Sequence, residues 1–190
     1  MRTKDENKTR LIFEAAVRLI KQTGVGGLTM ARLAKEADIA TGTLYIYFKN
    51  KEELLNELYQ TLRKETMDRF FLQVDPSEPY KICLKKVWMN YLKHRIEYYE
   101  ESFFLEQFYH SAFITPEQKA LAEDMKKPVY DLIERGKKEQ IIKNYDKEIL
   151  FSSMLGFLRE LVADHIEGRY ILNEERIEQG FQVTWDSLKT

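Results

Sequence analysis

Residues 29–53 read TMARLAKEADIATGTLYIYFKNKEE, and their pattern predicts two short helices joined by a tight turn. The first helix is expected over residues 30–37, where Leu33, Ala34 and Ala37 recur at helical spacing. The turn Asp-Ile-Ala that follows has the length that a helix-turn-helix needs. The small alanines would let the two helices cross closely. We therefore expect a helix-turn-helix here, with the rest of the chain organised around it.

The second short helix is expected over residues 41–47, with Ala40, Leu44 and Phe48 on its inward face. Its outward face is less usual, because it presents Ile46 and tyrosine side chains to solvent. A helix lying in the major groove of DNA has a use for such a face. Threonine hydroxyls meet base edges or phosphates, glycine permits close approach, and an isoleucine contacts a thymine methyl group. Tyrosine hydroxyls donate to phosphate oxygens, which positions a helix without specifying sequence.

A third helix is expected to begin at Asn50, with Glu53 as the partner in a capping box. Lys51 then lies in its first turn, where free backbone amides and an ammonium group suit a phosphate. Thr29 stands where a side-chain oxygen caps the first short helix. The residues expected to contact DNA are Thr29, Arg32, Thr41, Gly42, Thr43, Tyr45, Ile46, Tyr47 and Lys51.

The stretch resembles the DNA-binding signature of TetR-type transcriptional regulators. The resemblance lies in Leu33-Ala34, Ala37, Thr41-Gly42-Thr43-Leu44-Tyr45, Tyr47-Phe48 and Asn50-Lys51-Glu52-Glu53-Leu54. With the preceding helix it covers roughly the first quarter to third of the chain, and beyond it only the length and the pattern of helices agree. Asp38 departs from the family, which usually has glycine at this turn. Aspartate tolerates the left-handed conformation better than most residues, so we expect no change of fold.

Composition places the chain among ordinary folded proteins and fits the cytoplasm, and the resemblance implies that this is the cytoplasm of a bacterium. Of 190 residues, 44% are hydrophobic and 32% are charged, and no apolar run approaches a membrane span. The first ten residues lead into an amphipathic helix with acids in it, so we expect no signal peptide. The single cysteine, Cys83, cannot form an internal disulfide, which fits a reducing compartment.

The net charge of −1 hides an asymmetry between the two ends of the sequence. Residues 1–51 contain ten Lys/Arg and five Asp/Glu, whereas residues 52–190 contain twenty and twenty-six. A basic head on an acidic remainder suits a polyanion that binds at one end only. Chance is the alternative explanation, because a segment with this surplus is not rare.

Helical periodicity continues along the whole chain and predicts an all-α protein of about nine helices. Thr3 and Glu6 form the capping-box pattern that opens the first helix, whose start carries the basic residues Arg2, Lys4, Lys8 and Arg10. Pro128 is expected to kink a helix over residues 115–135. We expect residues 1–50 to form the DNA-binding head and residues 51–190 a helical body for effector binding and dimerisation.

The last two helices are expected over residues 146–165 and 173–188. By position they resemble the pair through which TetR-type proteins dimerise as a four-helix bundle. The predicted interface residues are Phe157, Leu158, Leu161, Ile177, Phe181 and Trp185. The alternative is ordinary core packing within one subunit. Dimerisation is expected on physical grounds, because two heads related by a two-fold axis can bind a palindrome whose half-sites are roughly 34–36 Å apart.

Aromatic residues are dense between Trp88 and Phe113, and the resemblance implies a small-molecule pocket in this part of the body. The expected lining residues are Trp88, Tyr91, Phe104, Phe108 and Tyr130. Aromatic residues at helical spacing also form plain cores, which is the alternative for each of them singly.

No arrangement of residues indicates catalysis, a metal site or a cofactor. His94, His110 and His165 lack metal-ligand spacing, and Cys83 has no neighbouring histidine or second cysteine in the sequence. The sequence therefore does not indicate an enzyme. The resemblance to TetR-type regulators implies a ligand-responsive repressor, with palindromic DNA, a second copy of itself and a small apolar or aromatic molecule as partners. Two readings stay open: a DNA-binding regulator whose body binds a protein, and a helical carrier protein with an idle head.

Overall fold

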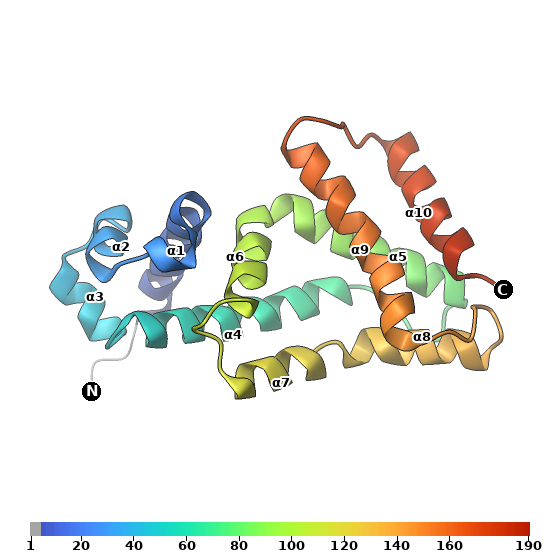
Figure 1. Ribbon diagram of the computed structural model, residues 1–190, viewed down its shortest axis with the longest axis horizontal. Coiled ribbons are helices and arrows are strands. Elements are labelled where there is room, and N and C mark those ends of the chain that lie inside the picture. The colour runs from blue at the N-terminus through green and yellow to red at the C-terminus, as the bar shows by residue number, and fades with distance from the viewer. Residues whose placement is uncertain (1–4) are drawn as a thin grey trace. The chain divides into compact units, whose positions relative to one another are not determined.

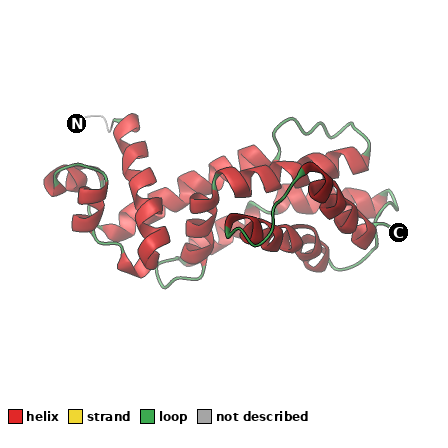
Figure 2. Cartoon of the chain, turned by 90° about the horizontal axis from the view of Figure 1, so that it is seen from above, coloured by secondary structure: helices red, strands yellow, loops and turns green. Residues whose placement is uncertain are grey.

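The computed structural model describes residues 5–190, and the regular structure in this range is helical (Figures 1 and 2). The helices are α1 (Glu6–Gly27), α2 (Met30–Glu36), α3 (Thr41–Tyr47), α4 (Lys51–Phe70), α5 (Tyr80–Glu97), α6 (Tyr99–Tyr109), α7 (Pro116–Asp124), α8 (Lys127–Lys138), α9 (Lys147–Ile166) and α10 (Glu174–Leu188). Within the described range, β pairing is limited to an isolated bridge between Ile142 and Lys189. The predicted all-α fold is confirmed.

Pro128 accounts for the one additional helix. The expected single helix over residues 115–135 is two helices, because α7 ends at Asp124 and α8 begins at Lys127 with the proline in its first turn. A proline lacks the backbone N–H that a helix interior needs, whereas the first turn does not use that donor. The predicted kink is therefore a break.

The predicted start of the first helix lies partly outside the described residues. Thr3 and two of the basic residues expected there, Arg2 and Lys4, belong to the undescribed segment. In the described chain α1 is capped by Asp5, whose carboxylate accepts from the backbone N–H of Asn7 at 3.0 Å. This satisfies one of the free donors that every helix has at its beginning.

The chain divides into two compact units. The head unit comprises the chain up to Glu65 together with Tyr98–Ala120, and the body unit comprises Thr66–Glu97 and Leu121–Thr190. The head unit is larger than the DNA-binding segment expected from the sequence, because α6 and most of α4 supply part of its core. The functional division at residue 50 stays a prediction.

The core of the head unit is built from residues that recur every three or four positions on α1, α2, α3, α4 and α6. Leu33 of α2 and Leu44 of α3 are fully buried in it, as are Leu54 and Leu58 of α4. Phe108 of α6 stacks on Tyr59 of α4 with ring centroids 4.9 Å apart. The short helices α2 and α3 are thus held by packing rather than by their own stability.

The body unit is organised around α9, which packs against α5, α8 and α10. Trp88 of α5 is fully buried there, and its indole N–H donates to Thr184 Oγ1 of α10 at 3.1 Å. Phe181 meets the Trp88 ring edge to face at 5.6 Å. No helix within residues 5–190 is long and apolar enough to cross a membrane.

His94 gives the body unit a stability that depends on pH. Its ring is buried against Phe70, and Nε2 lies 3.3 Å from Thr66 Oγ1. Burial, and then the charges of Arg69 and Arg95, lower the pKa of His94 to about 4. The unfolded chain, with a histidine pKa of about 6.5, binds more protons between these values. Protonation of His94 therefore does not affect the free energy of unfolding above about pH 6.5. As the pH falls toward 4, the free energy of unfolding decreases by on the order of 3 kcal/mol.

Urea denaturation at pH 7.5, 5.5 and 4.5 measures this loss. Because other groups titrate in the same range, the decisive quantity is the difference between the parent chain and His94→Gln, which should lose less stability on acidification. His110→Gln, a change at an exposed histidine, is the matched control and should behave as the parent. Equal pH profiles for all three proteins would contradict the assignment.

Candidate nucleic-acid interface

The turn between α2 and α3 adopts the conformation that the sequence suggested. Asp38 has φ +52°, in the left-handed region, and the N–H of Ile39 donates to the carbonyl of Ala34 at 3.0 Å. Aspartate tolerates this region, so the expectation for Asp38 is confirmed. Thr29 caps α2, because its Oγ1 accepts from the N–H of Arg32 at 3.3 Å.

The inward face of α3 differs from the prediction in one residue. Leu44 and Phe48 are fully buried, as expected. Ala40 is exposed, because it precedes the helix with extended backbone angles (φ −64°, ψ 139°) and its side chain does not join the helical stripe. Two large apolar residues therefore anchor α3 to the head core.

The outward face of α3 is open to solvent. Thr41, Gly42, Tyr45 and Ile46 are exposed, with 70% of the Ile46 surface accessible, while Thr43 and Tyr47 are half-buried at its edges. A Cβ atom built on Gly42 would meet nothing within 4 Å, so the fold itself does not require glycine there. A close external surface would require it. The geometry leaves this face available to a groove.

Two of the predicted DNA-contacting cations are engaged within the protein. Arg32 is exposed, and its Nη1 donates to the carbonyl of Gly27 at 3.1 Å. Lys51 Nζ donates to the carbonyl of Gly26 at 3.2 Å and lies 4.7 Å from the centroid of the Phe113 ring. Partial burial lowers the pKa of the Lys51 ammonium, an effect that Glu52 opposes.

These contacts give Lys51 a structural role that sequence reasoning missed. It joins the first turn of α4 to the C-terminal end of α1 and to the loop after α6. The cap at the same helix start is partly as expected: Asn50 Oδ1 accepts from the N–H of Glu53 at 2.8 Å. The Glu53 carboxylate accepts from the N–H of Lys49 instead of that of Asn50.

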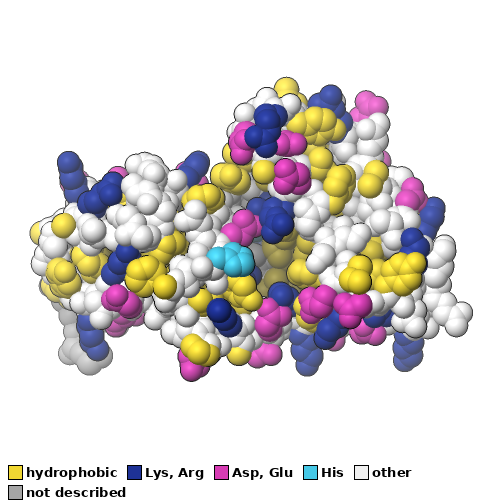
Figure 3. All heavy atoms as spheres, viewed as in Figure 1, with side chains coloured by type: hydrophobic (Ala, Val, Ile, Leu, Met, Phe, Trp, Pro, Cys, Tyr) yellow, Lys and Arg dark blue, Asp and Glu magenta, His cyan; other side chains and the backbone are white. Residues whose placement is uncertain are grey.

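Lys and Arg side chains also lie on the surface formed by α1 to α3 (Figure 3).

The five predicted ligand-lining residues do not form one set. Phe104 and Phe108 are fully buried in the core of the head unit. Trp88, Tyr91 and Tyr130 belong to the body unit, where Tyr91 packs on Phe70 and the Tyr130 hydroxyl donates to Glu148. Helical spacing is consistent with the burial of Trp88, Phe104 and Phe108, but it could not assign them to one of two cores.

The six predicted interface residues also divide. Leu158 and Phe181 are buried within the body unit, so they hold α9 and α10 against α5 and have no surface to offer a partner. Leu161, Ile177 and Trp185 are half-buried, and Trp185 stacks near Tyr80 at 6.5 Å. Of the six, Phe157 is the one that is exposed. The predicted interface stays a prediction, and Phe157 is the member of the set with the most exposed surface.

Within residues 5–190, no group of three or more His, Cys, Asp or Glu side chains is arranged to hold a metal ion. A helix-turn-helix with one face of its second helix outside the core, in a chain with a further helical unit, defines the class of helix-turn-helix transcriptional regulators.

Comparison with known proteins agrees with this class. The family description "Bacterial regulatory proteins, tetR family" matches residues 12–58, and "Tetracyclin repressor-like, C-terminal domain" matches residues 79–189. An uncharacterised HTH-type transcriptional regulator of Haemophilus influenzae is 28% identical over 192 residues, which cover 100% of each chain. YhgD, an uncharacterised HTH-type regulator of Bacillus subtilis, is 28% identical over 177 residues, covering 90% of this chain and 91% of that relative.

A solved structure shows the same fold. The TetR family transcription regulator of Marinobacter aquaeolei superimposes with a TM-score of 0.90 at 27% identity, covering 100% of this chain and 99% of that one. The chain belongs to the TetR family of DNA-binding transcriptional regulators. Members of this family are regulators and not enzymes, which confirms the expectation that this chain is no enzyme.

Proposed function

We propose that this chain is a cytoplasmic repressor that binds a palindromic operator as a homodimer and is released from it by a small molecule. The observation that carries the proposal is the outward face of α3, where Gly42, Tyr45 and Ile46 are exposed beside two threonines. This face has the residue types that read base edges and thymine methyl groups in a major groove. Residues 1–50 would supply this contact, and residues 51–190 would respond to the effector and dimerise.

Selection of bound DNA from a random pool tests the proposal most directly. The expected result is one enriched sequence with two-fold symmetry, bound with an affinity that falls steeply with salt. Enrichment of a single unsymmetrical half-site would contradict the dimer, and no enrichment would contradict the repressor.

Thr43 and Ile46 should decide which sequence is preferred. Removal of either side chain by alanine takes away a base-edge or methyl contact, so discrimination at one base pair of each half-site should relax by about 1–3 kcal/mol. Binding of the selected operator and of its single-base variants, measured for parent and mutants, checks this. An equal loss of affinity for every DNA sequence would show that these side chains contact only the backbone.

Tyr47 and Lys51 should act on all sequences alike. Lys51→Ala removes a cation near the proposed phosphate site, so it should weaken binding to any DNA and reduce the salt slope by about one. Tyr47→Phe removes a hydroxyl and should weaken binding by about 1 kcal/mol.

Lys51 needs a control, because it also bonds Gly26 and covers Phe113. Lys51→Arg keeps the charge and the cation over the ring, and it should restore most of the affinity. If Lys51→Ala and Tyr47→Phe both leave affinity untouched, α3 and α4 do not dock on DNA in the proposed orientation.

The proposed dimer would use the exposed side of α9 and α10. Ile149 and Phe157 of α9 and Val183 of α10 are large apolar side chains that remain exposed in the single chain. Ser153 Oγ of α9 lies 3.0 Å from Ser187 Oγ of α10, so the two helices are in contact beside these exposed side chains. Apolar side chains gathered on one side of a helix pair are typical of a surface that a partner covers.

A further inference from the structure

The ammonium of Lys51 lies between two parts of the head unit that are far from it in sequence. Its Nζ donates to the carbonyl of Gly26 at 3.2 Å and lies 4.7 Å from the centroid of the Phe113 ring. Gly26 belongs to the last turn of α1, and Phe113 belongs to the loop between α6 and α7. An ammonium has three donors, so the bond to Gly26 leaves donors for a phosphate oxygen.

The end of α1 is suited to hold cations. The last carbonyls of an α-helix have no N–H partner in the helix, and they lie at the negative end of its dipole. The last turn of α1 contains no basic residue of its own. Lys51 and Arg32 supply donors from outside the helix, since Arg32 Nη1 bonds the carbonyl of Gly27 at 3.1 Å. Both cations that are expected to contact DNA are therefore fixed at the same helix end.

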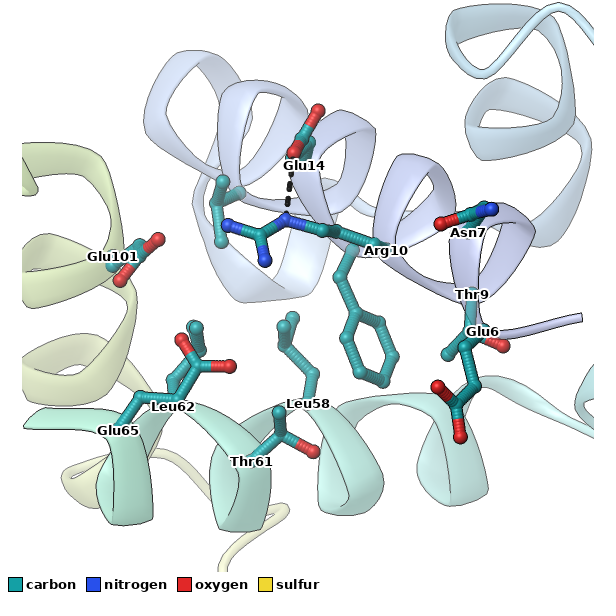
Figure 4. A pocket seen from close by; sticks show the side chains of 12 residues that line it. Glu6, Asn7, Thr9, Arg10, Glu14, Leu58, Thr61, Leu62, Glu65 and Glu101 are labelled. Atoms are coloured by element: carbon teal, nitrogen blue, oxygen red, sulfur yellow. Dashed lines mark hydrogen bonds and ion pairs between the residues drawn. The ribbon is translucent and has the colours of Figure 1, made fainter. Parts of the chain in front are cut away.

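Other cations of the head unit are held in a different way. Arg10 pairs with the carboxylate of Glu14 at 3.4 Å, as Figure 4 shows, and both side chains are largely exposed. Lys21 pairs with Glu100 at 3.1 Å. A carboxylate offsets the charge of its partner, whereas a carbonyl oxygen or a ring face holds a cation and leaves its charge in place. Lys51 thus keeps its charge for a phosphate.

Phe113 is itself held in place by its loop. Its backbone N–H donates to Ser111 Oγ at 3.2 Å, and its ring is half-buried against the head core. Gln118, in the first turn of α7, ties the same segment to α4, because its Nε2 donates to Asn56 Oδ1 at 2.8 Å. The Gln118 side chain is buried. The loop is therefore fixed to α4 and carries Phe113 to the Lys51 ammonium.

We propose that Phe113 is a positioning residue for DNA binding, whose ring holds the Lys51 ammonium in the place from which it bonds a phosphate. The inference rests on the proposed function, in which Lys51 contacts the DNA backbone. A lysine side chain that rotates freely must be ordered when it binds, and this ordering reduces affinity. Phe113 and Gly26 order it before DNA binds. The ammonium is partly desolvated, which lowers the pKa of Lys51, and a desolvated cation is attracted to a ring more strongly than an exposed one.

Substitutions of Phe113 that keep or remove the ring face test the role. Phe113→Leu keeps an apolar side chain without the ring, and it should weaken binding to the selected operator and to unrelated DNA alike, by about fivefold. Phe113→Tyr keeps the ring face and should stay within about twofold of the parent. Ile114→Val is the matched control, because Ile114 is the next residue and also packs against the head core. It leaves the ring in place and should leave DNA affinity unchanged.

A double-mutant cycle shows whether Phe113 acts through Lys51. In the Lys51→Ala background, Phe113→Leu should cause no further loss of affinity, because the side chain that it positions is absent. A further loss of about fivefold overturns the proposal. Unchanged affinity of Phe113→Leu in the parent background also overturns it, and the proposed function then stands, since the parent still binds its operator. A parent that binds no DNA overturns the proposed function, and the positioning role with it.

Nuclear magnetic resonance without DNA tests the contact itself. Protons above an aromatic ring resonate at higher field, so the ring of Phe113 should shift the ε-methylene signal of Lys51 upfield. The shift should be present in the parent and in Phe113→Tyr, and it should be lost in Phe113→Leu. Equal Lys51 signals in the three proteins overturn the contact, whatever the DNA titrations give.

Discussion

Phe48→Ala is expected to lower the free energy of unfolding of the head unit by about 3–5 kcal/mol. The Phe48 side chain has no accessible surface, and its ring lies 5.7 Å from that of Phe13 on α1. It stands directly after α3, a helix of seven residues that cannot persist in isolation. Its loss leaves a cavity between α3 and α1 and removes one of the two large apolar side chains that anchor α3. Urea denaturation followed by circular dichroism measures the change.

Ile46→Ala is the matched control for this prediction. It lies on the same helix, with 70% of its surface exposed, so its removal should change the unfolding free energy by less than about 0.5 kcal/mol. Phe48→Ala should therefore lose stability, whereas Ile46→Ala should keep its stability and change the DNA sequence that is preferred. Equal destabilisation by both would show that the two faces of α3 are wrongly assigned.

Local chemistry predicted the helix-turn-helix well, because its decisive features lie within a few residues of one another. Leu33 and Leu44 follow from periodicity, the cap at Thr29 follows from residue type, and the turn at Asp38 follows from the tolerance of aspartate for positive φ. The break before Pro128 was located, although a kink was expected in its place. Each of these is a property of a short window of sequence.

Features that depend on packing between distant segments could not be predicted in the same way. Phe104 and Trp88 both read as buried aromatic residues, but they belong to different cores. The ammonium of Lys51 is placed by Gly26 and Phe113, which are far from it in sequence. Periodicity identifies the buried face of a helix, but it does not identify the helix that packs against that face.

The double substitution Phe157→Asp with Val183→Asp is expected to reduce affinity for the full palindrome by roughly 10²–10⁴-fold. Gly180 lies close to Leu161, and Ser153 bonds Ser187, so α9 and α10 run antiparallel. Phe157 and Val183 therefore lie at the same level of the pair, between these two contacts. Both are exposed, at 36% and 56%, so charges there should not disturb the fold of the single chain.

The size of this effect follows from linkage of the two heads. Once one head of a dimer is bound, the second binds at a high effective concentration, and a monomer loses that advantage without losing any contact of its own. Light scattering on a sizing column should show the parent as a dimer and the double variant as a monomer. Ile82→Asp, at an exposed apolar residue of α5, should stay dimeric and keep its affinity. A double variant that remains dimeric places the interface elsewhere, and a monomer with undiminished affinity means that the heads act independently on DNA.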